Sequence, residues 1–175
     1  MTLTTEWQMV AQALLGNSYG NVYIRTYARC ISQDEINLTS TVQYQARIYF
    51  SGSSWILDGG GYGTISGSGA TSAGFTATQQ YPSGETPLET ITGTVSHDQD
   101  TGEASITTSA ALVYPNWSWS ATASGSANLP TIDVSTLRLR VNGNWVKAKP
   151  YLRVNGAWKQ CKAYLRVSGN WKKGV

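Results

Sequence analysis

The sequence predicts an all-β protein: an antiparallel β-sandwich followed by a small C-terminal array of three β-hairpin repeats. Three observations predict it. Charged residues make up only 13% of the chain, about half the usual share of a soluble domain, whereas Gly, Ser and Thr are abundant, as in strands and turns. Roughly seven or eight strand-like segments follow one another at intervals of about 8–12 residues. Near the C-terminus, one short sequence motif occurs three times.

The N-terminal half supplies the first strand-like segments. The segment that starts at residue 4 is compatible with a short helix at its beginning, and residues 21–30 then alternate as a strand does. Residues 39–51 predict a half-buried strand, because apolar and polar side chains alternate with period two. We expect Val42, Tyr44, Ala46, Ile48 and Phe50 on the buried face, and Gln43, Gln45, Arg47 and Tyr49 on the other.

The second half of the predicted sandwich is richer in turns. Glycines cut residues 52–84 into three short strands, and residues 86–114 predict two strands around a tight turn at 97–103. Residues 116–129 predict a last strand with Trp117 and Trp119 on one face. The strand spacing is that of an Ig-like or jelly-roll sandwich. We expect four tryptophans to supply much of the bulk of its core: Trp7, Trp55, Trp117 and Trp119.

Charge divides the chain into two predicted units. Residues 1–130 hold three cationic and nine acidic side chains, a balance of −6, whereas residues 131–175 hold ten cationic side chains and one acid, a balance of +9. Pro130 breaks the strand pattern at the same place. The expected domains are therefore a β-sandwich at 1–130 and basic hairpin repeats at 131–175.

The repeated motif spans residues 140–145, 153–158 and 166–171, with a constant step of 13 residues. Asn-Gly between alternating flanks is the strongest short-range hairpin signal, because a type I′ turn needs positive φ at both central residues. The turn predicts that Val154 faces Ala157, Arg153 faces Trp158 and Leu152 faces Lys159. A 13-residue unit with an apolar face needs a partner surface. The candidate partner-binding residues are Arg140, Trp145, Arg153, Trp158, Lys159, Arg166, Trp171 and Lys172.

The basic tail suits several partners. Interleaved cations and aromatic rings fit nucleic acid, anionic cell-wall polymers or an acidic protein surface. We expect the tryptophans to form the core of each repeat and the cations to contact a protein partner, and we do not expect nucleic acid. The nearest acidic surface is residues 1–130 of a neighbouring copy, which predicts a homo-oligomer, with a trimer favoured.

Motifs for chemistry are weak in this sequence. His97, the single histidine, has no accompanying Ser or Cys nucleophile motif, and we expect it to be a surface residue of a turn. Residues 98–103 have only a faint likeness to a calcium loop, and Asp and Gly also suit a turn. The glycine-rich stretch 59–69 lacks the Gly-Lys-Ser/Thr of a phosphate loop. We expect no enzyme activity, no cofactor and no metal.

The sequence predicts neither a membrane span nor a secretory signal. No run of about 18 apolar residues predicts a membrane span, and the N-terminus has no signal-peptide pattern. Cys30 and Cys161 are far apart, so two isolated thiols are favoured over a disulfide.

Two stretches resemble proteins of tailed bacteriophages. Residues 151–172 (YLRVNGAWKQCKAYLRVSGNWK) resemble the VNGAWK-type repeats that end many of their structural proteins. Residues 95–132 resemble an "H-x-x-D-G … LP-x-I" pattern of Ig-like domains in tail-associated proteins from phages of Gram-positive bacteria, with one extra residue in the turn at Thr101.

The resemblance implies a non-enzymatic structural protein of the virion, assembled in the host cytoplasm. It favours the tail or baseplate, with a role in assembly or host attachment, and other virion proteins as partners. A capsid decoration or head-fibre protein is the near alternative. A carbohydrate-binding module that contacts a host cell-wall glycan through Trp and Tyr is an alternative of another class.

Overall fold

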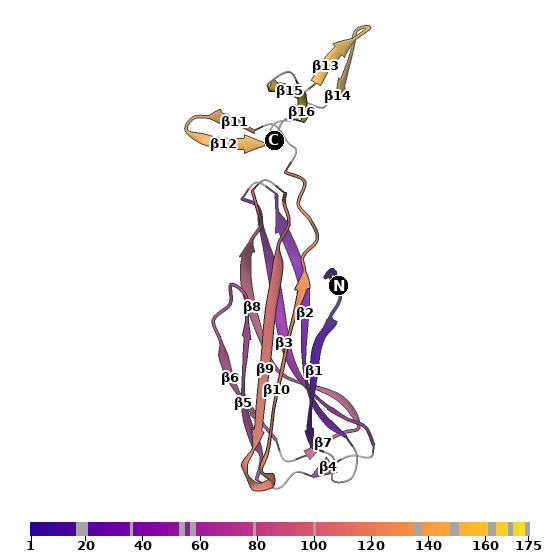
Figure 1. Ribbon diagram of the computed structural model, residues 1–175, viewed down its shortest axis with the longest axis vertical. Helices are drawn as coiled ribbons and strands as arrows, with labels where there is room; N and C mark the ends of the chain where they lie inside the picture. The colour runs from indigo at the N-terminus through magenta and orange to yellow at the C-terminus, as the bar shows by residue number, and fades with distance from the viewer. Residues whose placement is uncertain are drawn as a thin grey trace.

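The computed structural model describes residues 1–16, 21–35, 37–52, 55–56, 59–78, 80–99, 101–134, 138–147, 151–160, 164–167 and 170–173. Within these ranges the chain forms strands and one 3-10 turn, η1 (Pro115–Trp117), and no α-helix (Figure 1). Accordingly, none of the described segments is a long apolar helix of the kind that crosses a membrane. The all-β prediction is confirmed.

Two four-stranded antiparallel sheets form the body of the protein (Figure 1). The first has the order β1-β2-β3-β8, with β1 (Gln8–Gly16), β2 (Val22–Asp34), β3 (Thr39–Phe50) and β8 (Gly84–Ser96). The second has the order β10-β9-β5-β6, with β5 (Gly61–Gly67), β6 (Ala73–Ala77), β9 (Ser105–Tyr114) and β10 (Trp119–Asn128). The short strands β4 (Trp55–Ile56) and β7 (Gln80–Tyr81) pair separately. The sheets pack against each other as the sandwich prediction requires.

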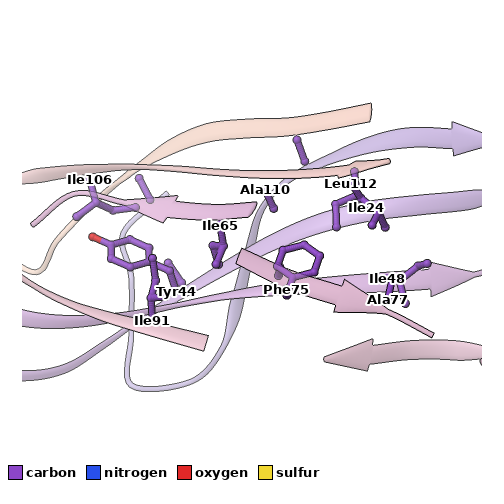
Figure 2. Close-up of a cluster of buried hydrophobic side chains, with 14 of the residues drawn as sticks. Ile24, Tyr44, Ile48, Ile65, Phe75, Ala77, Ile91, Ile106, Ala110 and Leu112 are labelled. Carbon is purple, nitrogen blue, oxygen red and sulfur yellow. The ribbon is translucent and has the colours of Figure 1, made fainter. Parts of the chain in front are cut away.

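The core lies between the two sheets and follows the predicted alternation of β3. Val42, Tyr44, Ala46, Ile48 and Phe50 are each 1% exposed or less. Figure 2 shows Tyr44 and Ile48 among side chains of the opposite sheet, such as Ile65 and Phe75. Burying one large apolar side chain contributes about 1.5–3 kcal/mol. The core side chains from β5, β6, β8 and β9 are Ile65, Phe75, Ala77, Ile91, Ile106, Ala110, Leu112 and Tyr114.

Three buried hydroxyl groups of this core are hydrogen bonded. The Tyr44 hydroxyl donates to the carbonyl oxygen of Ser68 at 2.8 Å, and the Thr26 and Thr108 hydroxyls meet across the two sheets at 2.8 Å. Burial is the main reason that the pKa of Tyr44 rises to about 12. The core therefore combines apolar packing with hydrogen bonds that specify how the sheets align.

The initial helix is wrong: residues 8–16 form β1, which pairs antiparallel with β2. A short apolar run fits either period until a partner is available. The partner here is β2, and Gly16 allows the close approach of Trp119, whose ring lies where a Cβ atom at residue 16 would be. Register shifts between Met9 and Ala11 and between Leu14 and Gly16 interrupt the alternation that would have marked the strand.

The turn at 97–103 joins the two sheets and is not a hairpin. β8 lies in the first sheet and β9 in the second, so the strands that flank the turn do not pair. The turn is closed by its own backbone, with the Asp98 N–H donating to the Glu103 carbonyl at 2.8 Å. Flanking alternation identifies two strands but not the sheet to which each belongs.

Tryptophan does not fill the core, contrary to the sequence-based expectation. Trp117 and Trp119 pack on its edge with ring centroids 5.2 Å apart, and Trp117 belongs to η1 rather than to a strand. Trp7 contacts arginines of the first sheet's outer face. The side chain of Trp55 lies outside the described residues. Sheets packed about 10 Å apart enclose aliphatic and phenyl-sized groups instead.

The predicted unit boundary near residue 130 falls where the chain still contacts the sandwich. The Leu129 N–H donates to the Ala104 carbonyl and the Ile132 N–H to the Gly102 carbonyl, both at 2.9 Å. Ile132 is 2% exposed. The division at 130/131 stays a prediction, and these contacts show that the segment just after Pro130 is anchored.

Candidate functional site

The C-terminal segment contains three two-stranded antiparallel sheets, each made by one copy of the repeated motif. They are β11 (Arg138–Val141) with β12 (Asn144–Lys147), β13 (Tyr151–Val154) with β14 (Ala157–Gln160), and β15 (Tyr164–Val167) with β16 (Asn170–Lys173). The register pairs Arg140 with Trp145, Arg153 with Trp158 and Arg166 with Trp171. These are the cross-strand partners that the sequence predicts.

The first two turns have the backbone that a type I′ turn requires. Asn142 and Gly143 have φ values of 50° and 84°, and Asn155 and Gly156 have 50° and 79°. Asn tolerates the left-handed region and Gly enters it without steric cost, so the Asn-Gly pair sets the register of each hairpin. The third turn, Ser168-Gly169, lies outside the described residues.

The hairpin β13–β14 exposes both of its faces. Leu152 is 60% and Trp158 68% exposed. The prediction that Trp158 forms the core of its repeat is therefore wrong. The Arg153 Cζ lies 6.0 Å from the centroid of the Trp158 ring, and Arg153 Nε donates to the Gly156 carbonyl at 3.4 Å. Arg140 and Lys159 are also exposed. The side chains of Trp145, Arg166, Trp171 and Lys172 lie outside the described residues.

His97 is buried, so its prediction as a surface residue is wrong. It is 5% exposed; Nδ1 lies 2.8 Å from the Gly102 carbonyl oxygen and Nε2 lies 2.7 Å from Ser40 Oγ. A carbonyl only accepts, so Nδ1 carries the hydrogen, and Ser40 then donates to Nε2 when the ring is neutral. The imidazole ties the 97–104 connection to β3 and serves the fold.

Asp98 is engaged in its own turn rather than displayed to a ligand. Its Oδ1 accepts from the Thr101 N–H at 2.7 Å and from the Thr101 hydroxyl at 3.0 Å. Across the part of the chain that the structure describes, no group of three or more His, Cys, Asp or Glu side chains is placed to hold a metal ion. Cys30 is a buried free thiol, and Cys161 lies outside the described residues.

A second candidate surface, which the sequence analysis missed, covers the outward side of the first sheet. We call it the arginine–aromatic face. The register of β2 and β3 places its residues in rows, with Tyr23 beside Tyr49, Arg25 beside Arg47, Tyr27 beside Gln45 and Arg29 beside Gln43. Trp7, Glu85 and Gln12 complete it through the side-chain contacts described below. All three cations of residues 1–130 lie on this face.

Glu85 stabilises the centre of this face. Arg25 and Arg47 are direct neighbours across the strands, and like charges so placed repel. Glu85 Oε1 accepts from Arg25 Nη1 at 2.6 Å, and Oε2 accepts from Arg47 Nη1 at 3.0 Å. The Tyr27 hydroxyl also donates to this carboxylate. Burial by itself raises the pKa of Glu85, but the hydrogen bonds from Tyr27, Arg25 and Arg47 outweigh it and hold the pKa below its usual value.

Aromatic rings cover the guanidinium groups of the face. The Cζ atom of Arg25 lies 3.8 Å from the Tyr49 ring centroid, and that of Arg47 lies 4.1 Å from the Tyr27 centroid. Arg29 lies 4.6 Å from the Trp7 centroid. Such contacts contribute about 0.5–2 kcal/mol each, depending on solvent exposure.

The amides of the face complete this order. Arg29 also donates twice to Gln43 Oε1, from Nε at 3.0 Å and from Nη2 at 2.8 Å. Arg25 Nε donates to Gln12 at 3.1 Å, and Arg47 Nε donates to Gln45 at 2.6 Å. Each arginine is therefore held in one orientation by a ring and an amide.

The sequence carried part of the signal for this face. Period two places Arg25 and Arg29 on one side of β2, and it correctly places Gln43, Gln45, Arg47 and Tyr49 on the outer side of β3. The meeting of the three arginines depends on the β2–β3 register and on Glu85 arriving from β8, which pairs with β3. No protein-family model matches the chain, and no curated protein matches it significantly.

Proposed function

We propose that the chain is a non-enzymatic structural protein of a bacteriophage virion, in the tail or baseplate, where it serves assembly or host attachment. It would be assembled into the particle in the host cytoplasm. The observation that carries the proposal is a β-sandwich followed by three hairpins with the same cross-strand register. Each hairpin is made from the motif that resembles phage virion repeats.

The hairpins act in this proposal as docking elements. A two-stranded hairpin is at best marginally stable in water, and β13–β14 exposes Leu152 and Trp158 together with Arg153 and Lys159. Covering the apolar groups stabilises the hairpin, and the cations favour an acidic partner surface. The partners are other virion proteins or neighbouring copies of this chain, with a homo-oligomer, and a trimer in particular, favoured.

The state of His97 supports a role without catalysis. It is the single histidine of the chain, and both of its ring nitrogens are hydrogen bonded to Ser40 and Gly102 inside the protein. A general base must reach a proton on the substrate, and this imidazole is enclosed. The contacts of His97 are those of a residue that holds a connection in place.

Immunogold labelling of intact virions tests the proposal. Antibody raised against the purified protein should label the tail or baseplate. Labelling of the capsid would instead support a decoration or head-fibre protein. Infected-cell fractions that contain the protein while purified particles lack it would overturn the assignment to the virion.

A carbohydrate-binding module remains a second candidate because of the arginine–aromatic face. Trp7, Tyr23 and Tyr49 offer rings, and Gln43 and Gln45 offer amides, on one side of a sheet. Retention of the purified protein on host cell walls, reduced by Trp7→Ala and not by the exposed control Tyr62→Ala on β5, would favour this candidate.

A further inference from the structure

We propose that the arginine–aromatic face is a protein-docking surface whose occupant is the acidic surface of a second copy of this chain. The inference deepens the homo-oligomer of the proposed function and assigns an interface to it. It depends on that homo-oligomer but not on whether the particle is a phage.

Charge is distributed unevenly over residues 1–130. The arginine–aromatic face holds Arg25, Arg29 and Arg47 against Glu85, a balance of +2. The rest of residues 1–130 then holds eight acidic side chains and no Lys or Arg. Away from this face, the charged side chains that the structure describes in residues 1–130 are therefore acidic and opposite in sign to it. Two such faces would repel each other, so the contact joins different surfaces of the two copies.

Residue composition on this face is that of a protein interface. Tyr, Trp, Met and Arg are enriched in the interfaces of protein complexes, whereas Lys, Glu and Asp are depleted, and Trp, Tyr and Arg dominate their binding energy. The face has Tyr, Trp and Arg, no lysine and one glutamate. Met9 and Leu14 on β1 are the cross-strand neighbours of Tyr27 and Tyr23. They are 42% and 49% exposed, so a partner would bury apolar area at this edge.

The side chains of the face are ordered before any partner arrives. Arg29 is held between Trp7 and Gln43, and Arg25 and Arg47 share Glu85. Arginine side chains lose much rotamer entropy when they are held in one orientation, and binding costs less when that entropy has already been lost. The internal contacts thus favour docking of a rigid surface.

The symmetry of the contact follows from its chemistry. A contact between two different surfaces is heterologous, and it generates a closed ring if the rotation between copies closes, or a filament if it does not. A closed ring is compatible with the trimer that the sequence favours. The attraction between a +2 face and a negative surface should weaken as salt shortens the Debye length, from about 10 Å at 0.1 M to about 3 Å at 1 M.

Sedimentation velocity of the full-length chain tests the proposal, at tens of micromolar protein, a working range for weak association, in low and high salt. We expect an oligomer in low salt that dissociates in high salt. Arg29→Gln removes the charge and the Trp7 contact, and should weaken association at least about tenfold, equivalent to about 1.4 kcal/mol. Thr122→Glu is the matched control: it makes the same change in net charge at an exposed position on the other sheet, and should leave association unchanged or strengthen it.

Each outcome decides the proposal. A monomeric wild type in low salt would overturn it, as would equal weakening by Arg29→Gln and Thr122→Glu, which would indicate a net-charge effect. Unchanged association in Arg29→Gln would assign the oligomer to the hairpins. If Arg29→Gln fails to fold by circular dichroism, Met9→Glu at the exposed edge of the same face replaces it, with the same expected loss. A monomer retained on cell-wall glycan through Arg29 would assign the face to glycan. Absence from the virion would refute only the proposed function.

Discussion

Replacing Glu85 by Gln tests the centre of the arginine–aromatic face. The substitution keeps the shape of the side chain and removes the charge that separates Arg25 from Arg47. A hydrogen bond to a charged group contributes about 1.5–3 kcal/mol, and exposed ion pairs about 0–1 kcal/mol. The side chains of Arg25 and Arg47 are 17% exposed and that of Glu85 is 26% exposed. The contribution of each contact of Glu85 therefore lies between that of a buried charged hydrogen bond and that of an exposed ion pair. We expect a loss of about 2 kcal/mol in the free energy of unfolding.

Urea denaturation followed by tryptophan fluorescence measures this loss, since urea does not screen charge. For a chain of this size, 2 kcal/mol lowers the melting temperature by about 4–8 °C. Glu6→Gln is the matched control, because Glu6 is exposed and carries the same change of charge. A difference between the two variants of less than about 0.5 kcal/mol, the usual range of surface substitutions, would refute the bridging role of Glu85.

The pH dependence of this difference gives a second check. The pKa of Glu85 is lowered in the folded protein, so its contribution is fully present above the unfolded value of about 4.3. The contribution is lost as the pH falls through the lower pKa of the folded state. Wild type and Glu85→Gln should therefore converge in stability as the pH falls through that lower pKa. A stability gap that stays constant from pH 7 to pH 3 would contradict the ionic origin.

Three further substitutions, with Gly74→Ala as a control, test the sandwich. His97→Ala should cost about 2–4 kcal/mol, because it leaves a cavity and removes the hydrogen-bond partner of Ser40 and of the Gly102 carbonyl; a cost below about 0.5 kcal/mol in urea would return His97 to a surface role. Wild type should lose stability as the pH rises from about 10 towards 12, because folded Tyr44 binds a proton that the unfolded chain releases; Tyr44→Phe should lose less over that range, and an equal loss would contradict the burial argument. Gly67→Ala should cost about 1–3 kcal/mol by overpacking, since its Cβ atom would lie 2.4 Å from the Tyr44 ring. Gly74→Ala, whose Cβ atom would meet nothing closer than 3.8 Å, should change the unfolding midpoint little, and equal costs at the two glycines would argue against that contact.

Local patterns determined the elements that the sequence could predict. The period-two alternation of residues 39–51 identified the buried and outward faces of β3, because a strand alternates its side chains whatever its neighbours are. Asn-Gly identified the cross-strand pairs of the first two hairpins, because positive φ at two successive residues leaves one hairpin register. Both signals act within a few residues, so they can be recognised from the sequence alone.

Only the tertiary structure decided how distant segments meet. The sequence did not show that β8 and β9 lie in different sheets, that β1 is a strand, or that His97 reaches Ser40, 57 residues away in the chain. It also did not show that Arg25, Arg29, Arg47 and Glu85 converge, although it contained each of them. Their convergence requires the order β1-β2-β3-β8 and the register of each pair. Sheet order and register are set by long-range packing of the two faces, because any strand can pair with any other through the same backbone groups.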